Sequence, residues 1–78
     1  MNCDPPMDYL EAALTVLREE DEPLHWTVVQ DLALKRGYLD PFIQKDIRKH
    51  LLAELAKAAR QGLLVKESTG VYALKQPP

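Results

Sequence analysis

Prolines and glycines divide the chain into short segments, and this division limits the possible fold more than any other feature of the sequence. Pro23 stops a helix, because proline lacks a backbone N–H and clashes with the preceding turn. Gly37 and Gly62 stand where helices commonly end in a left-handed residue, and Gly70 stands in a polar turn. Pro41 occupies a position favoured at the first turn of a helix. These positions predict several helices followed by a hairpin.

The first predicted helix covers residues 8–20. Asp8 and Glu11 have the spacing of a capping box, in which the first side chain accepts a hydrogen bond from the first helical turn. Apolar side chains then recur at helical intervals, at Leu10, Ala13, Leu14 and Leu17. The acidic run at residues 19–22 and Pro23 end this helix, and residues 24–26 form a short extended segment.

The second predicted helix covers residues 28–36, with Gly37 as its C-terminal cap. Thr27 and Gln30 repeat the capping-box spacing. Its apolar stripe consists of Val29, Leu32 and Ala33.

The third helical stretch covers residues 41–61, which contain no glycine and no proline after Pro41. It forms either one helix or a short helix followed by a longer one, and the change in composition near His50 favours a break near Lys49. At about 100° per residue, one side of this stretch is apolar and belongs to the core. That side collects Ile43, Ile47, Leu51, Leu55 and Ala58.

The C-terminal segment LLVKESTGVYALK contains two short runs rich in β-branched and aromatic residues around a turn at Gly70, so it predicts a hairpin. Residues 24–26 can pair with its edge. The result is an α+β fold of winged helix-turn-helix type. It has three helices, or four if residues 41–61 are broken, a C-terminal hairpin and a short strand between the first two helices. The predicted domain covers residues 8–75, with tails at residues 1–7 and 76–78.

Length and composition exclude several functional classes. The 78 residues, 46% hydrophobic and 28% charged, suffice for one core but not for a catalytic cleft between two lobes. Cys3 is the only cysteine, and with His25 and His50 it gives no recognised metal-ligand spacing. No nucleophile, carboxylate pair or glycine-rich loop stands in a catalytic motif. We therefore expect no enzyme activity, no metal and no cofactor.

Residues 1–6 contain neither a basic cluster nor an apolar run, so we expect a cytoplasmic protein with no secretory signal and no membrane partner.

The two halves of the chain carry opposite charge, although the net charge is only -2. Residues 1–43 contain three basic and nine acidic groups, a balance of -6, and residues 44–78 contain seven basic and three acidic groups, a balance of +4. The first half repels phosphate, whereas the second half can attract it. A nucleic-acid partner is therefore compatible with the sequence despite its acidic average.

The phrase EAALTVLREEDEPLHWTVVQDLALKRG, together with GVYAL near the end, resembles the HARE-type helix-turn-helix family of winged-helix modules, which is related to the N-terminal domain of the RNA polymerase delta subunit. The matching residues are Val16, Leu17, 23–26, 33–37 and 70–74. The chain departs from the family at DPFIQKDIRKHLL, where relatives have a Gly/Thr/Pro-containing loop. Members of the family are attached to restriction endonucleases, chromatin regulators and polymerase, so the resemblance implies DNA binding or docking onto the transcription machinery.

Duplex DNA is the first predicted partner. The polar side of residues 41–61 surrounds small alanines with positive side chains, which allows a helix to approach a groove closely. It collects Lys45, Lys49, Ala53, Ala56, Lys57 and Arg60, with Arg48 at its margin. Arg48 and Arg60 are the predicted base readers, and Lys66, Ser68 and Thr69 at the hairpin tip can contact phosphate. The alternative is that these charges are an ordinary solvated face and the hairpin tip merely a soluble turn.

A protein partner is the second hypothesis. Tyr38, Leu39 and Phe42 can form an exposed apolar patch that contacts RNA polymerase, another transcription protein or a second copy in a homodimer. The acidic half would then face a basic partner. The remaining aromatic groups, His25, Trp26, Tyr9 and Tyr72, are expected to pack in the core rather than to stack on bases.

Overall fold

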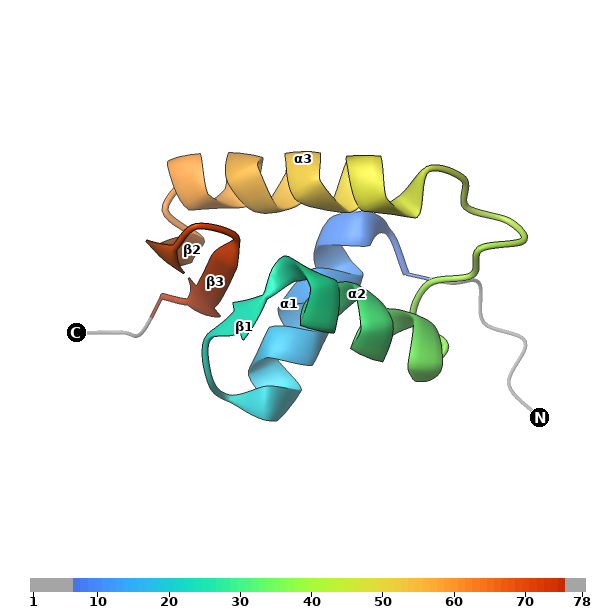
Figure 1. Ribbon diagram of the computed structural model, residues 1–78, viewed down its shortest axis with the longest axis horizontal. Coiled ribbons are helices and arrows are strands. Elements are labelled where there is room, and N and C mark those ends of the chain that lie inside the picture. The colour runs from blue at the N-terminus through green and yellow to red at the C-terminus, as the bar shows by residue number, and fades with distance from the viewer. Residues whose placement is uncertain (1–6, 76–78) are drawn as a thin grey trace.

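The computed structural model describes residues 7–75 and contains three helices and one antiparallel three-stranded sheet (Figure 1). In chain order the elements are α1 (Tyr9–Glu20), β1 (Leu24–His25), α2 (Trp26–Lys35), α3 (Ile47–Arg60), β2 (Leu64–Ser68) and β3 (Val71–Leu74). The strand order is β1-β3-β2, so the short strand between the first two helices pairs with the last strand of the hairpin. The predicted α+β winged-helix arrangement is confirmed. Of the predicted tails at residues 1–7 and 76–78, residues 1–6, which include Cys3, and residues 76–78 lie outside the described residues.

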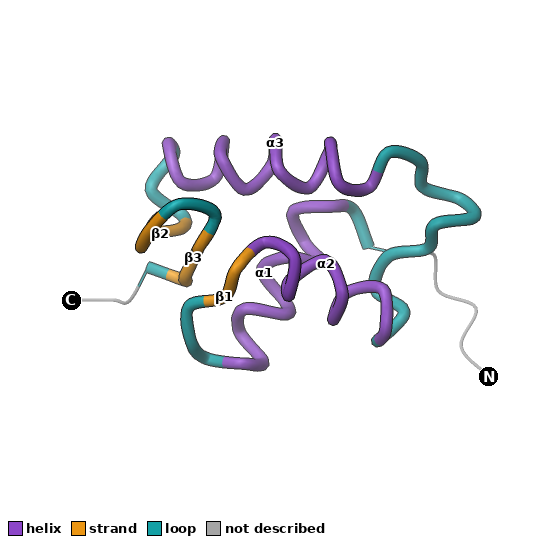
Figure 2. Tube along the Cα trace, viewed as in Figure 1, coloured by secondary structure: helices purple, strands orange, loops and turns teal. Residues whose placement is uncertain are grey.

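The three helices enclose one core, and the sheet lies beside the C-terminal end of α3 (Figure 2). The largest fully buried side chains come from α1, α2, α3 and the segment after α2, and they are Val16, Leu17, Val29, Leu39, Leu51 and Leu55. α3 forms one edge of the molecule, and the turn between α1 and β1 lies at the opposite edge. Among the helices described, none is both long and apolar enough to cross a membrane.

α1 begins as predicted. The Asp8 side chain accepts a hydrogen bond from the Glu11 N–H at 2.7 Å, which satisfies one free donor of the first turn. Met7, which the sequence analysis placed in the N-terminal tail, is tied to the segment after α2. The Met7 N–H donates to the Tyr38 carbonyl at 2.8 Å, and the Met7 carbonyl accepts from the Gln44 amide at 2.8 Å.

α2 begins two residues earlier than predicted, and its cap is His25 instead of Thr27. His25 Nδ1 accepts from the Thr27 N–H at 3.3 Å and lies 2.8 Å from the Thr27 hydroxyl. The predicted Thr27–Gln30 capping box is therefore wrong, and Gln30 Oε1 is buried without a hydrogen-bond partner among the described residues. The end of α2 agrees with prediction, because Gly37 has a left-handed backbone with φ +78°.

Residues 41–61 form one turn and one helix, and the predicted break near Lys49 is wrong. Asp40 caps a single turn by accepting from the Phe42 N–H at 2.9 Å, and the chain then leaves helical geometry before α3 begins at Ile47. Asp46 has φ 52°, a left-handed conformation that a continuous helix excludes. Ile43, which was predicted to lie in the core, is therefore carried outside α3 and is 67% exposed.

The hairpin has the predicted position, and its turn contains Thr69 and Gly70 between β2 and β3. Leu64 pairs with Leu74 and Lys66 with Tyr72, and a bulge then shifts the register so that Ser68 pairs with Val71. This hairpin is the wing of the fold.

Candidate nucleic-acid interface

The solvent-facing side of α3 carries the candidate interface. We call this surface the α3 outer face and define it by Lys49, Ala53, Ala56, Lys57 and Arg60. The three cations and Ala53 are exposed, and Ala56 is half-buried, while the opposite side of the helix is buried in the core. The face has the predicted composition, with long positive side chains around two small ones. A phosphate backbone or groove floor can therefore approach the helix closely.

The cations of the α3 outer face are not neutralised by carboxylates. Within residues 7–75, the ion pairs are confined to Arg36, which binds Glu19 at 2.8 Å and Glu20 at 2.7 Å. The helix itself carries one acidic residue, Glu54, which is half-buried on the side of α1. Positive charge on α3 is thus available to an anionic partner.

Lys45 was predicted to belong to this surface, but it lies in the segment before α3. Its side chain is exposed, and its backbone carbonyl accepts a hydrogen bond from the Tyr9 hydroxyl at 3.0 Å. The carbonyl contact fixes the backbone, not the ammonium group, so Lys45 can reach a ligand only from the N-terminal end of α3.

Arg48 lies at the margin of the α3 outer face, as predicted, but its guanidinium group has a partner inside the molecule. The guanidinium carbon lies 5.5 Å from the centroid of the Trp26 ring, which is within the range of a cation–π contact. The Trp26 ring is half-buried and also faces His25 at a centroid distance of 5.7 Å. A cation–π contact uses the positive charge of the guanidinium group and not its N–H donors, which can still bind an acceptor.

Of the three residues of the wing that were predicted to contact phosphate, two lie at its tip and one lies farther back along the strand. Ser68 ends β2 and Thr69 lies in the turn, and both are exposed as predicted. Lys66 is also exposed, but it lies within the paired part of β2, opposite Tyr72, and not at the tip. The turn is pressed against α2: the Trp26 N–H donates to the Gly70 carbonyl at 2.8 Å, which fixes the wing relative to the helices.

His50 is a residue of this surface that the sequence analysis did not assign. It is exposed, and its ring stacks on Tyr9 with centroids 4.8 Å apart. His50 precedes Lys57 by seven residues, a spacing that places both near the same side of a helix. That spacing could have identified it as a neighbour of the α3 outer face.

The predicted apolar patch for a protein partner is only partly exposed. Leu39 is 2% exposed and belongs to the core, so the expectation that it contributes to the patch is wrong. Tyr38 is half-buried and donates its hydroxyl to the Glu19 carboxylate, which raises the pKa of the tyrosine. Phe42 is 90% exposed, and Ile43, which the prediction placed in the core, lies beside it in the chain.

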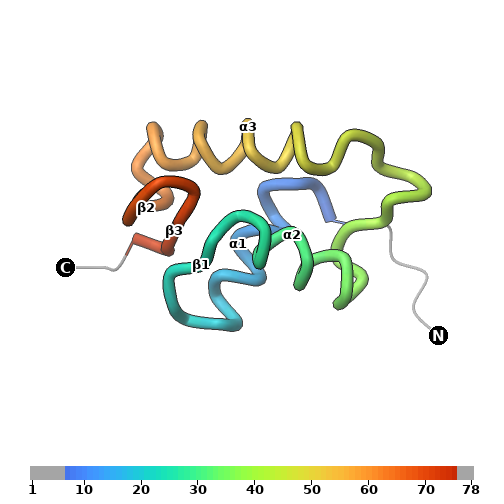
Figure 3. The backbone as a smooth tube through the Cα atoms, in the orientation of Figure 1, coloured from blue at the N-terminus to red at the C-terminus, as the bar shows by residue number. Residues whose placement is uncertain are grey.

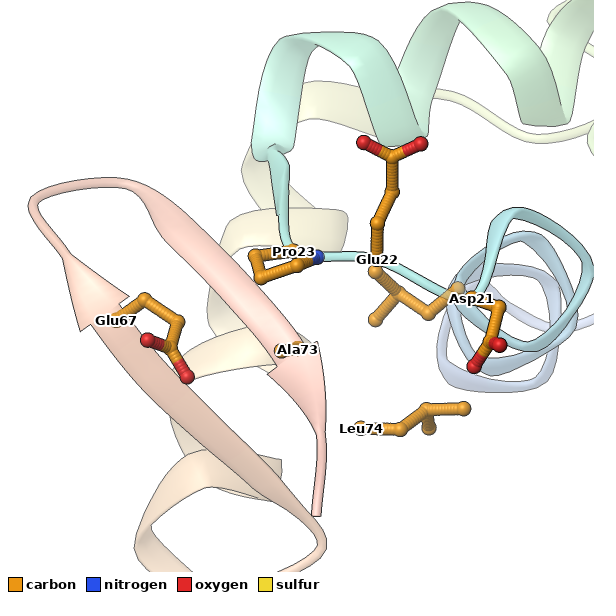
Figure 4. Close-up of a pocket in the computed structure, with 7 residues that line it drawn as sticks. Asp21, Glu22, Pro23, Glu67, Ala73 and Leu74 are labelled. Carbon is orange, nitrogen blue, oxygen red and sulfur yellow. The ribbon is translucent and has the colours of Figure 1, made fainter. Parts of the chain in front are cut away.

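An acidic cleft, opposite in charge to the α3 outer face, lies between the α1–β1 turn and the hairpin (Figure 4). It has a volume of about 230 Å³ and an apolar lining that includes Leu17 and Leu74. Asp21, Glu22 and Glu67 also line it, and their negative charge repels phosphate and favours a cationic group.

Across residues 7–75, no three His, Cys, Asp or Glu side chains approach closely enough to hold a metal ion, and the three acidic residues of the cleft are included in that finding. Comparison of the chain with family models, curated proteins and solved structures finds no match.

Proposed function

We propose that this protein is a non-catalytic winged-helix protein that binds duplex DNA in the cytoplasm and regulates transcription. The α3 outer face and the wing are the proposed contact surfaces. The observation that supports this proposal is the α3 outer face itself, where Lys49, Lys57 and Arg60 surround Ala53 and Ala56 without a paired carboxylate. Helix-turn-helix proteins place the second helix of the motif in the major groove, and α3 is that helix here.

The arrangement of charge favours this orientation on DNA. α3 lies at one edge of the molecule, and the acidic α1–β1 turn lies at the opposite edge (Figure 1). A duplex bound at α3 therefore meets the basic surface and avoids the acidic one. The resemblance to HARE-type modules, which was inferred from the sequence, agrees with a role in transcription, and we propose membership of that family on the same basis.

Salt dependence tests the proposal directly. If Arg48, Lys49, Lys57 and Arg60 each neutralise one phosphate, the logarithm of affinity should fall with the logarithm of salt concentration with a slope of about -4. We expect gel-shift or anisotropy titrations of a random-sequence duplex to give this slope. Affinity that stays constant across the salt series would contradict the proposal.

Charge reversal locates the surface. Lys49→Glu with Arg60→Glu should abolish binding, because the reversal places negative charge against phosphate. The matched control is Arg18→Glu with Lys35→Glu, which changes the net charge equally at exposed positions on α1 and α2. Equal losses in the two double variants would show that only net charge matters and would refute the assignment to α3.

A second candidate function is docking of a basic protein segment in the acidic cleft. The carboxylates of Asp21 and Glu67 beside the apolar side chains of Leu17 and Leu74 suit the aliphatic stem and charged end of lysine or arginine. The test is titration with a lysine-rich peptide, monitored by NMR. Binding that is lost in Asp21→Asn with Glu67→Gln, and kept in Lys49→Glu with Arg60→Glu, would favour this function over DNA binding.

A further inference from the structure

The turn between α2 and α3 exposes two large apolar side chains next to each other. Phe42 is 90% exposed and Ile43 is 67% exposed. The other large hydrophobic side chains on the surface, Val28, Leu63 and Val65, are at most 48% exposed. We call Phe42 and Ile43 the apolar tip. Adjacent exposed apolar side chains mark interaction sites more often than isolated ones.

Hydrogen bonds connect the backbone of the apolar tip to the residues around it. The Asp40 carbonyl accepts from the N–H groups of Ile43 at 3.1 Å and Gln44 at 2.7 Å, and the Asp40 N–H donates to Gln44 Oε1 at 2.9 Å. The Gln44 amide donates in turn to the Met7 carbonyl at 2.8 Å, which joins the turn to the start of α1. A partner therefore meets a preorganised surface, and little backbone ordering opposes binding.

The position of the tip allows a contact that leaves the α3 outer face free. The turn projects from the N-terminal end of α3, and the wing lies at the other end of the molecule (Figure 3). Two copies that meet tip to tip about a two-fold axis would each keep the wing and the α3 outer face uncovered. Such a contact is isologous, because the same surface on each copy forms it.

The charges beside the tip are complementary to themselves. Lys45 and Asp46 are adjacent, exposed and oppositely charged, and neither forms an ion pair within the described part of the chain. In a two-fold arrangement, Lys45 of one copy can face Asp46 of the other, and the pairing occurs twice. A partner with charge of one sign, such as DNA or an acidic peptide, would be attracted by Lys45 and repelled by Asp46.

We propose that the apolar tip binds the tip of a second copy and forms a two-fold dimer. The contact is small: an aromatic side chain buries about 150–250 Å², whereas a stable interface needs about 800 Å² from each partner. The dimer is therefore weak and concentration-dependent. It goes beyond the proposed DNA binding and does not rest on it, although a dimer on DNA would join two weak sites and increase the total affinity.

The test is the molar mass of the protein without nucleic acid, measured by sedimentation equilibrium from micromolar to millimolar concentration. We expect the mass to rise toward twice that of the chain. Phe42→Ser with Ile43→Ser should keep the monomer mass throughout. The control Val28→Ser with Leu63→Ser removes two other exposed apolar side chains and should dimerise like the wild type. Circular dichroism confirms that each variant is folded.

A charge variant tests whether the occupant is a second copy. Lys45→Glu should weaken the dimer about threefold to tenfold, because the two-fold axis creates two pairs of residues 45 and 46, and the substitution makes both pairs repulsive. Adding Asp46→Asn should recover about half of the loss, since it removes the Glu–Asp repulsion without restoring the Lys45–Asp46 attraction, and asparagine tolerates the left-handed conformation. Wild-type protein that stays monomeric at every concentration, or a dimer that persists in Phe42→Ser with Ile43→Ser, would overturn the proposal. Neither result depends on whether the protein binds DNA.

Discussion

Replacing Gly70 with alanine should destabilise the protein more than the same change at Gly37, although the two glycines have nearly the same positive φ angle. Gly70 has φ +77° and Gly37 has φ +78°. A Cβ atom at Gly37 would meet nothing within 4 Å, whereas one at Gly70 would lie 2.7 Å from His25 Nε2 and 3.1 Å from Trp26 Cδ1. The pair of variants therefore separates backbone strain from a steric clash.

The expected losses follow from these contacts. A left-handed backbone costs an alanine about 1–2 kcal/mol, and this cost applies at both positions. At Gly70 the His25 ring must also move, and it then loses the position from which Nδ1 caps α2 at Thr27. Loss of a helix N-cap costs about 1 kcal/mol. We expect losses of about 1–2 kcal/mol for Gly37→Ala and about 2–3 kcal/mol for Gly70→Ala.

Urea denaturation followed by circular dichroism measures both losses. A double-mutant cycle with His25→Ala then isolates the clash: in that background the cost of Gly70→Ala should approach the cost of Gly37→Ala. Equal losses at the two glycines in the wild-type background would refute the reasoning, because they would show that the wing turn can move away from His25 without cost.

Three further predictions concern α1 and the aromatic contacts. Asp21→Gly should stabilise the protein by about 1 kcal/mol in urea denaturation, since Asp21 has a left-handed backbone with φ 53° and places negative charge at the C-terminal end of α1. Asp21→Asn should give only the part of this gain that comes from removing the charge. The hydrogen bond to Glu19 raises the pKa of Tyr38 above its ordinary value of 10. The stability that this hydrogen bond contributes is therefore complete below pH 10 and is lost as the pH rises through the raised pKa. Tyr38→Phe should remove this alkaline loss of stability, and an absorbance titration of Glu19→Gln should show a lower tyrosine pKa. Arg48→Ala should destabilise the fold by about 0.5–1 kcal/mol and change the fluorescence of Trp26, and an unchanged spectrum would contradict the cation–π contact.

Local chemistry explains which parts of the fold could be predicted from the sequence. Asp8 caps α1, and Gly37 and Gly70 adopt left-handed backbones, because each effect depends on a few neighbouring residues. The start of α2 depends on a distant contact instead. The Trp26 N–H binds the Gly70 carbonyl, 44 positions along the chain, and this pairing lets the helix begin before Thr27.

The same distinction accounts for the error in residues 41–61. Every residue from 42 to 61 is compatible with a helix, so the local pattern predicts continuity. The chain nevertheless departs from the helix before Ile47, where the Tyr9 hydroxyl binds the Lys45 carbonyl and Gln44 binds Met7. These contacts join residues more than 30 positions apart and have no local signal. They also explain why Ile43 is exposed and Lys45 lies off α3.

The candidate site was predicted where it depends on helical periodicity alone. Lys49, Lys57 and Arg60 share one side of α3 because residues at about 100° intervals return to the same face. The partner of Arg48 could not be predicted in this way, since Trp26 reaches it from another helix. Periodicity identifies which cations face outward, but tertiary packing determines which of them is held in place.

The acidic half of the molecule affects DNA binding according to the salt concentration. Glu20, Asp21 and Glu22 belong to the end of α1 and the turn that follows it, which lies at the edge of the molecule opposite α3 (Figure 1). A helix is about 10 Å across, so the thickness of α3 alone separates them by at least about 10 Å from a duplex bound at its outer face. At physiological ionic strength the Debye length is about 8 Å, so these charges are largely screened from a duplex bound at α3. At about 0.01 M salt the Debye length reaches about 30 Å, and the same carboxylates then repel the duplex. The affinity gained on lowering the salt should therefore level off at low ionic strength, and neutralising Glu20 and Glu22 with glutamine should restore the linear rise.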